Sequence, residues 1–277
     1  MIELAFAVGN HSAAPLPALV QEAPVAVVCN ASTIAVMMAS PADLEDFAIG
    51  FALTEGMIRD LSELDDLEIV PHPSGYEARL WLTGPAGASV AARQRAMIGP
   101  VGCGLCGIDS LAKVDRPLPH LPVGSVRLTI AEACQAVILL RDHQPEHDRT
   151  RACHAAGFLL PDRGIILARE DVGRHNALDK LAGALARDGV DLATGAIVLT
   201  SRVSTEMVQK AVSIGATVVI AVSAATDYAV RIATEANLTL VTRARGGRAE
   251  ILAAPHRVSG SNLRPATLLP LAAGCDP

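Results

Sequence analysis

The hydrophobic pattern of the first third of the chain predicts strands and a single helix. Two β-rich runs, Val25–Cys29 and Thr33–Ala39, flank the turn Asn30-Ala31-Ser32 and predict a hairpin. Apolar positions then follow a helical period from Pro41 to Gly56, with Pro41 expected at the first helical position. Two further strands are expected, at Leu67–Val70 and Tyr76–Leu82. We therefore expect a small β-rich domain that contains one helix.

From Thr129 onward the pattern changes to strands that alternate with helices. A helix is predicted at Thr129–Leu140, with Thr129 as its N-cap, and a hairpin follows at Ala155–Leu160 and Gly164–Ala168. Another helix is predicted to begin near Gly173. The remaining elements are strands at Ala196–Thr200, Thr217–Val222 and Leu238–Val241, with helices after Ser204 and at Thr226–Ala236. This alternation predicts an α/β fold whose sheet is covered on both faces.

These changes of pattern suggest four segments along the chain. We expect a small β-rich domain over residues 1–99 and a glycine- and proline-rich loop and connector over 100–126. An α/β domain is expected over 127–258, followed by a tail over 259–277.

Composition and charge restrict the classes of function. Of the 277 residues, 51% are hydrophobic and 19% are charged, which is typical of a globular chain. The net charge of −6 argues against nonspecific nucleic-acid binding, which needs a basic surface. The amino terminus lacks a positive signal-peptide region, and apolar runs stay below the roughly 18 residues of a membrane span. The expected location is the cytoplasm, without membrane association.

The glycine-rich stretch Val101–Gly107 carries two cysteines, Cys103 and Cys106. In a reducing compartment such a pair indicates catalysis or metal binding more than a structural disulfide. A structural zinc site needs four ligands, and a second CxxC pair is missing. Dithiol redox chemistry expects the pair at a helix start, whereas glycine and proline surround it here. Two interpretations of the pair remain open. It provides a thiolate that carries sulfur as a persulfide, or it consists of two incidental exposed thiols.

Polar clusters follow three successive predicted strands. Asp171, Arg174 and His175 lie where a strand gives way to a helix, and Asp179 lies one turn beyond His175, where it could orient the imidazole. The clusters that follow the next two strands include Ser201, Arg202, Ser223 and Thr226. Each alone would suit a plain helix cap, but three at one sheet edge favour a pocket whose helix starts bind an anion.

A basic turn is expected after the last predicted strand. It consists of Arg243, Ala244, Arg245, Gly246, Gly247 and Arg248. Arginine side chains can fork onto phosphate oxygens while glycine lets the backbone approach closely, so this turn favours phosphate binding over a merely solvated loop. His154, taken alone, is more often a structural histidine than a catalyst.

Taken together, these motifs resemble the FdhD family, the accessory sulfurtransferases of formate dehydrogenase, from about Val25 to Val258. The matching segments are Thr54–Gly56, Cys103–Gly107, Glu170–Lys180, Ser201–Lys210 and Ser223–Thr226. Two departures stand out. Arg151 occupies a position where the family has glycine, upstream of His154, and Arg243 one where it has an aromatic residue.

The resemblance implies both a fold and an activity. It implies a cytidine-deaminase-like three-layer α/β sandwich for the C-terminal domain, beside the smaller β-rich domain. It also implies that a cysteine desulfurase passes sulfur to Cys103, with Cys106 assisting, for delivery to the bis-molybdopterin guanine dinucleotide form of the molybdenum cofactor. Formate dehydrogenase would be the recipient, GDP a fragment ligand, and a homodimer the expected assembly. Asp171 is expected to accept from the guanine amino group, and His154 to belong to the cofactor site.

Two other functions compete with this one. A zinc-dependent deaminase would need a histidine or cysteine followed two residues later by glutamate, and the sequence offers none. A non-catalytic chaperone for the molybdenum cofactor would remain if the two thiols were dispensable.

Overall fold

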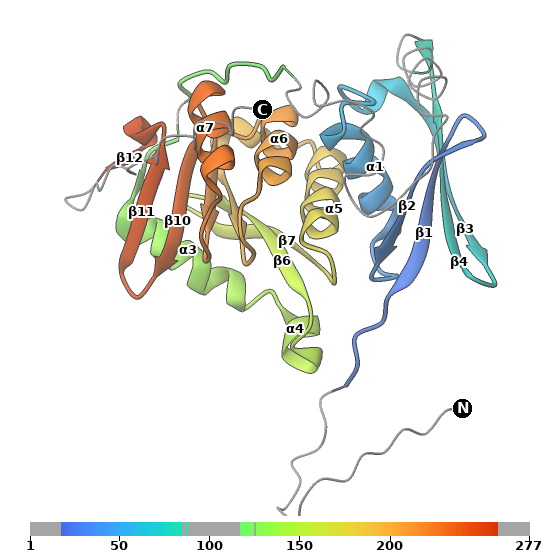
Figure 1. Cartoon of the computed structure of the whole chain (residues 1–277), viewed down its shortest axis with the longest axis horizontal. Helices are drawn as coiled ribbons and strands as arrows, with labels where there is room; N and C mark the ends of the chain where they lie inside the picture. The colour runs from blue at the N-terminus through green and yellow to red at the C-terminus, as the bar shows by residue number, and fades with distance from the viewer. Residues whose placement is uncertain (1–17, 85–86, 88–116, 125, 260–277) are drawn as a thin grey trace, which may run out of the picture.

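Two sheets and their helices make up the protein, which is described by a computed structural model covering residues 18–84, 87, 117–124 and 126–259. Figure 1 shows the N-terminal sheet on one side and the larger α/β part on the other, with helices α1 and α5 between them. The predicted boundary at residues 99 and 100 lies outside the described residues, so the division into four segments stays a prediction.

The N-terminal sheet has the strand order β2-β1-β4-β3 within the described residues. Its strands are β1 (Ala23–Cys29), β2 (Ser32–Ala39), β3 (Leu64–His72) and β4 (Gly75–Leu82). Strands β1 and β2 pair antiparallel, which confirms the predicted hairpin, and β1 and β4 pair parallel. Alternate β1 side chains, Val25, Val27 and Cys29, are fully buried and face helix α1 (Leu44–Thr54).

Helix α1 begins later than the sequence pattern predicts. Pro41 does not occupy the first helical position, because Asp43 adopts a left-handed conformation with φ of 53° and the helix starts at Leu44. The residue just before this turn, Ser40, is held by the C-terminal part of the protein. Tertiary contacts therefore decide where the helix begins.

The larger sheet has the order β11-β10-β9-β8-β6-β7 within the described residues. Its strands are β6 (His154–Leu160), β7 (Gly164–Asp171), β8 (Ala196–Leu199), β9 (Val218–Ala221), β10 (Thr239–Arg245) and β11 (Arg248–Ala253). Strands β8, β9 and β10 run parallel, and β6 runs antiparallel to both β7 and β8. The sheet is therefore mixed, and β7 points in the same direction as β8.

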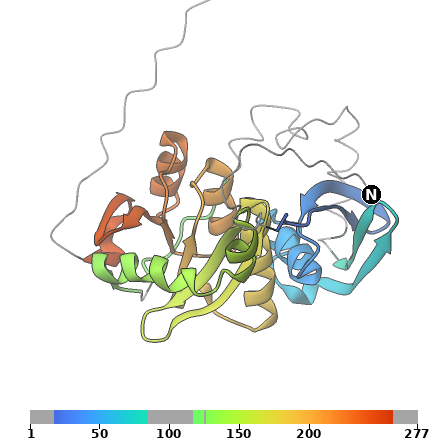
Figure 2. The ribbon, with the colours of Figure 1, turned by 90° about the horizontal axis from the view of Figure 1, so that it is seen from below.

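Helices cover both faces of this sheet, which confirms the three-layer α/β sandwich (Figure 2). One face packs on α3 (Ile130–Arg141), and the other on α5 (Arg174–Arg187), α6 (Thr205–Ser213) and α7 (Asp227–Glu235). Thr129 caps α3 in a capping box with Glu132, as its position predicts. None of the helices in the described part of the chain is both long enough and apolar enough to cross a bilayer.

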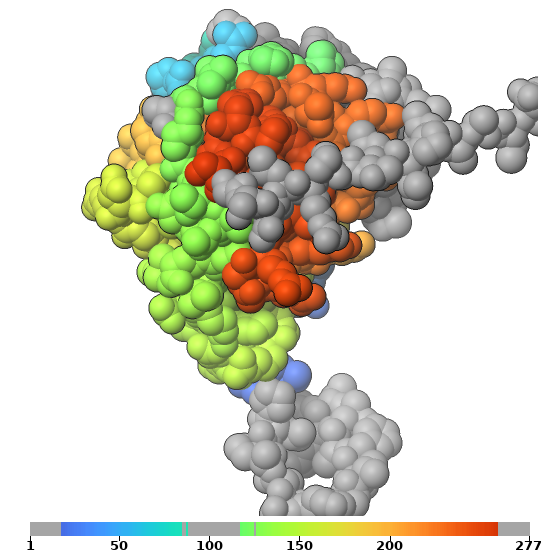
Figure 3. All heavy atoms as spheres, turned by 90° about the vertical axis from the view of Figure 1, so that its left-hand side faces the viewer, coloured from blue at the N-terminus to red at the C-terminus, as the bar shows by residue number. Residues whose placement is uncertain are grey.

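Some elements of the described residues have no counterpart in the prediction. Strand β11 pairs antiparallel with β10 and lies beside α3, as Figure 3 shows for the red and green segments. The short helix α4 (Pro145–Thr150) begins at a proline, and its weak local pattern gives no helical period. A two-residue strand, β5 (Leu128–Thr129), pairs with β12 (Val258–Ser259) where we expected the tail to begin.

Candidate functional site at one edge of the sheet

The predicted polar clusters do meet at one edge of the larger sheet. Strands β7, β8 and β9 end there at Asp171, Leu199 and Ala221, and the register joins Leu199 to Ala221 and to Ala156. Strand β6 runs the opposite way, so its first residue, His154, lies opposite Asp171 at the same edge. Helix α4 and the β10–β11 hairpin lie along this edge, at the bottom of Figure 1.

Backbone hydrogen bonds connect the loops that follow β8 and β9 with each other and with the end of strand β10. The amide of Val203 donates to the carbonyl of Ala224 at 3.0 Å, and the amide of Thr226 donates back to Val203 at 3.1 Å. The amide of Arg243 in β10 donates to the Ser223 carbonyl at 3.1 Å. These loops therefore form a continuous rim, although the expected single cleft stays a prediction.

The start of helix α5 carries a cationic side chain with one unsatisfied nitrogen atom. Arg174 is the first residue of this helix, and its Nε atom is buried without a hydrogen-bond partner among the described residues. Since a helix N-terminus also presents free amides and a partial positive charge, this position suits an anion. Burial lowers the pKa of the nearby His154, and the charge of Arg174 lowers it further.

His175 contacts a carboxylate that the sequence analysis did not identify. Its Nε2 atom lies 2.9 Å from Glu206 in the first turn of α6, an ion-pair distance without hydrogen-bond alignment. The contact with His175 lowers the pKa of Glu206, although burial acts in the opposite direction. Glu206 comes from a neighbouring helix, so only the placement of α6 beside α5 could reveal the pair.

Asp179 does not orient His175, and that prediction was wrong. The side chain is fully buried one turn further along α5, where it accepts from the Thr54 hydroxyl at 2.6 Å and from Lys210 at 3.0 Å instead of from His175. Lys210 also pairs with Glu55 at 2.7 Å. The Thr54–Gly56 segment therefore meets Asp179 and Lys210 in a buried polar cluster that joins α1, α5 and α6.

Glu170 and Asp171, at the end of strand β7, organise the backbone around the site. Both oxygens of Glu170 accept amides at the start of α4, from Glu146 and His147 at 2.8 Å each. Asp171 is fully buried and binds Lys180 at 2.7 Å. Its two carboxylate oxygens also accept hydrogen bonds from backbone amides. Asp171 is therefore not placed to accept a hydrogen bond from the guanine amino group, and that expectation is corrected.

The starts of α6 and α7 differ in what they leave unsatisfied. Ser204 is the N-cap residue of α6, but its hydroxyl makes no capping bond and is buried without a partner among the described residues. Thr226 accepts from the Ala229 amide and is an ordinary cap of α7. The Ser201 hydroxyl donates to the carbonyl of Arg202, whose own side chain is exposed. Ser204 is thus the better candidate for a ligand contact.

The basic segment is a strand end and a tight hairpin turn. Arg243 and Arg245 still belong to β10, and only Gly246 and Gly247, with φ of 58° and 72°, form the turn before Arg248. All three arginines are exposed, whereas Ala244 is fully buried, so only its backbone could face a ligand. Arg243 pairs with Glu250 at 3.1 Å.

The altered position upstream of His154 keeps the backbone shape of a glycine. Arg151 ends helix α4 with a φ of 59°, a left-handed conformation that costs most side chains energy. The next cysteine along, Cys153, is buried, and its carbonyl contacts His147 at 3.0 Å. The backbone around His154 is therefore held by α4 in spite of the substitution. Cys103 and Cys106 lie outside the described residues.

Residues 20–259 match the model of a known family, described as the FdhD/NarQ family. The chain belongs to this family. Among curated proteins, it is 46% identical to "Sulfur carrier protein FdhD" of Agrobacterium fabrum over 243 residues, 87% of this chain and 89% of that protein. It is also 46% identical to the protein of the same name from Cupriavidus necator, over 86% of this chain and 82% of that protein.

A solved structure shares the fold of this family member. It is described as a putative formate dehydrogenase accessory protein from Desulfotalea psychrophila, and it aligns with a TM-score of 0.68. The alignment covers 86% of this chain and 90% of that one, at 24% identity. At this identity the likeness supports the fold alone.

Proposed function

We propose that this protein is a sulfur carrier that supplies sulfur to the molybdenum cofactor of a formate dehydrogenase. The observation that carries the proposal is the identity of nearly half of the aligned residues to proteins named sulfur carrier, in a chain that keeps the paired thiols Cys103 and Cys106. The family membership favours this function over the deaminase. The alternative function, a non-catalytic chaperone for the molybdenum cofactor, differs from a sulfur carrier in that it does not need the two thiols for activity.

The proposed transfer uses Cys103 as the sulfur acceptor. Its thiolate attacks the outer sulfur of a persulfide on a cysteine desulfurase, which forms a Cys103 persulfide and releases the desulfurase thiolate. Attack by Cys106 on the inner sulfur then releases the outer sulfur as hydrosulfide and leaves a Cys103–Cys106 disulfide. The two thiols supply the two electrons for this reduction, and a dithiol reductant restores them.

The proposed substrate site is the sheet edge described above. The substrate, a bis-molybdopterin guanine dinucleotide, carries pyrophosphates that suit Arg174, the unsatisfied hydroxyl of Ser204 and the α5 and α6 starts. Two exposed arginines, Arg245 and Arg248, flank the β10–β11 turn and would bind further phosphate oxygens. GDP is the fragment expected to bind alone. The remaining candidates for this edge are His154, His175, Ser201, Arg202, Ser223, Thr226 and Arg243, with the turn backbone at Ala244, Gly246 and Gly247.

The proposed assembly has two protein partners and a second copy of the chain. A cysteine desulfurase donates the sulfur, and a formate dehydrogenase receives the finished cofactor, both in the cytoplasm. A homodimer would offer two copies of the edge to the two guanine dinucleotide units of one cofactor, and the linked units would then bind more tightly than GDP.

Mass spectrometry of the loop peptide tests the sulfur transfer. After incubation with a cysteine desulfurase and cysteine, the peptide that contains Cys103 should gain the mass of one sulfur atom, and a reductant should remove it. Cys103→Ala should abolish this gain and the activation of formate dehydrogenase in cells that lack the wild-type chain. Cys29→Ala is the matched control, because this buried thiol lies in strand β1 of the N-terminal sheet, outside both the loop and the proposed site. Full activation by Cys103→Ala would favour the chaperone.

A further inference from the structure

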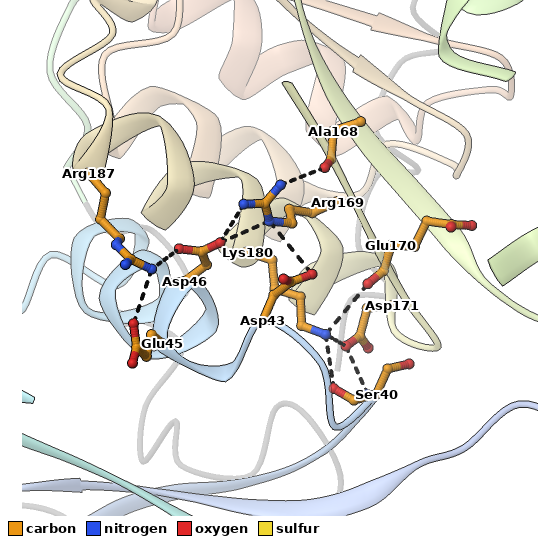
Figure 4. Close-up of polar contacts among 10 residues, drawn as sticks. All are labelled: Ser40, Asp43, Glu45, Asp46, Ala168, Arg169, Glu170, Asp171, Lys180 and Arg187. Atoms are coloured by element: carbon orange, nitrogen blue, oxygen red, sulfur yellow. Dashed lines mark hydrogen bonds and ion pairs between the residues drawn. The ribbon is translucent and has the colours of Figure 1, made fainter. Parts of the chain in front are cut away.

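Ser40, between β2 and α1, binds the start of the α5 segment with each of its polar groups. Its amide donates to Asp171 at 2.9 Å, its hydroxyl accepts from the Val172 amide at 3.2 Å, and its carbonyl accepts from Lys180 at 2.9 Å. Figure 4 shows Ser40, Asp171 and Lys180 converging in this way. A loop of the N-terminal sheet is thus fastened directly to the segment that leads into Arg174.

The same carboxylate also shapes the first turn of α5. Asp171 accepts from the Gly173 amide at 2.7 Å and from the Asn176 side chain at 3.0 Å, and Asn176 donates to the carbonyl of Met38 at 2.8 Å. Ser40, Asp171 and Lys180 are buried, so water does not compete for these bonds. The position of the backbone between Asp171 and Asn176 therefore depends on Ser40.

We infer that Ser40 is a positioning residue for the ligand site, which it reaches from the other sheet by fixing the loop that places Arg174 and His175. The inference rests on the proposed function, because it assumes that this edge binds the guanine dinucleotide. Removal of the Ser40 hydroxyl leaves the partly buried Val172 amide without its acceptor, so the loop must shift to satisfy it. By reciprocity, a ligand that needs the present loop position strengthens the contact between the two sheets.

A second contact between the same two parts offers a matched control. Arg187, at the end of α5, pairs with Asp46 at 2.8 Å and with Glu45 at 3.2 Å, as Figure 4 also shows. Asp46 keeps Arg169 as a partner at 2.7 Å if Arg187 is lost. Arg187→Ala therefore weakens the attachment of α1 without touching the loop at Val172.

The test measures GDP affinity by calorimetry for the wild type, Ser40→Ala, Ser40→Thr and Arg187→Ala, together with the thermal midpoint of each. We expect Ser40→Ala to weaken GDP binding by about tenfold, the effect of losing roughly one good hydrogen bond at the site. Ser40→Thr keeps a hydroxyl and should recover most of the affinity. Arg187→Ala should lower the midpoint but leave the affinity within about twofold of the wild type. Equal GDP affinities of the wild type and Ser40→Ala would overturn the inference.

Hydrogen exchange of the wild-type protein gives a second measurement that needs no variant. Saturating GDP should slow exchange of the Ser40 and Val172 amides, and the amides of α3 should serve as the unaffected reference. Unchanged exchange at Ser40 and Val172 with GDP bound would also overturn the inference. If the wild type does not bind GDP, the proposed substrate site is wrong. If it binds GDP but Ser40→Ala has the same affinity, only the role of Ser40 is wrong.

Discussion

Gly50 of α1 and Gly183 of α5 bring the two parts of the protein into backbone contact. A Cβ atom on Gly50 would lie 1.6 Å from the carbonyl oxygen of Asp179, and one on Gly183 would lie 1.9 Å from that of Asp46. Neither neighbour is a flexible side chain, so no rotamer change could make room. The two glycines therefore permit α1 and α5 to cross closely, with buried polar clusters on either side of the crossing.

Gly183→Ala should destabilise the protein by about 3 kcal/mol or more, because the added methyl group forces the helices apart. Urea unfolding followed by circular dichroism would measure it. Gly215→Ala is the matched control, since Gly215 has a φ of 79° and no heavy atom of the described residues lies within 4 Å of its Cβ position. That change should cost only about 1 kcal/mol of backbone strain. Similar losses in the two variants would argue against a close crossing.

Lys210→Met should cost about 3–5 kcal/mol, because it leaves the buried carboxylate of Asp179 without its cation. Burial acts to lower the pKa of Lys210, but the carboxylates of Asp179 and Glu55 outweigh it and raise this pKa, so the lysine is charged. The double variant Lys210→Met/Asp179→Asn should regain much of the loss in urea unfolding.

The control for this cluster is the exposed pair of Arg149 and Glu146, for which Arg149→Ala should cost less than about 1 kcal/mol. If the double variant at positions 210 and 179 is no more stable than Lys210→Met, then the uncompensated charge is not the cause of the loss.

Glu206→Gln should change the pH dependence of stability on the acid side. Because the folded-state pKa of Glu206 is lowered, its stabilising effect is complete above the unfolded pKa of about 4.3 and is lost as pH falls through the folded pKa. Wild type and variant should thus differ at about pH 6, by less than about 1 kcal/mol for this partly exposed pair, and converge below about pH 4. A difference that grows on acidification would contradict the assignment.

Arg151→Gly should stabilise the protein by about 0.5–1 kcal/mol, because glycine adopts the φ of 59° at the end of α4 without strain. Among the described residues, the variant loses one ion pair, the exposed contact with Asp148 at 3.5 Å. Thermal unfolding would show the gain. Arg163→Gly, at an exposed position in the β6–β7 turn, is the control and should not stabilise. A lower midpoint for Arg151→Gly would mean that its side chain makes a stronger contact than the ion pair.

Arg245→Ala/Arg248→Ala should weaken GDP binding by about tenfold or more if both side chains bind phosphate, and the wild-type affinity should fall at high salt. Calorimetry would measure both effects. The control is Arg59→Ala/Arg163→Ala, which removes the same charge from exposed arginines away from the β10–β11 turn. If the two double variants bind GDP equally well, the arginine turn does not belong to the site.

Local sequence patterns determined most of the elements and their order. The hairpin at Val25–Cys29 and Thr33–Ala39, the capped helix after Thr129 and the alternating strands up to Val241 depend on side-chain period and capping, which act within a few residues. The sequence also predicted that the polar clusters share one edge of the sheet, because strands that alternate with helices tend to run parallel. Strand β11 was missed, because it follows an arginine- and glycine-rich turn that resembles a loop.

Tertiary structure alone decided which polar residues face the site and which hold the two parts of the protein together. The sequence predicted that Asp171 contacts the ligand and that Asp179 orients His175. Both are instead buried, Asp171 against Ser40 and Asp179 against Thr54, and each partner is more than 120 positions away in the chain. Glu206 reaches His175 only because α5 and α6 lie side by side. Local spacing cannot encode these pairings, because they arise from the packing of α5 against α6 and from the crossing of α1 over α5 at Gly50 and Gly183.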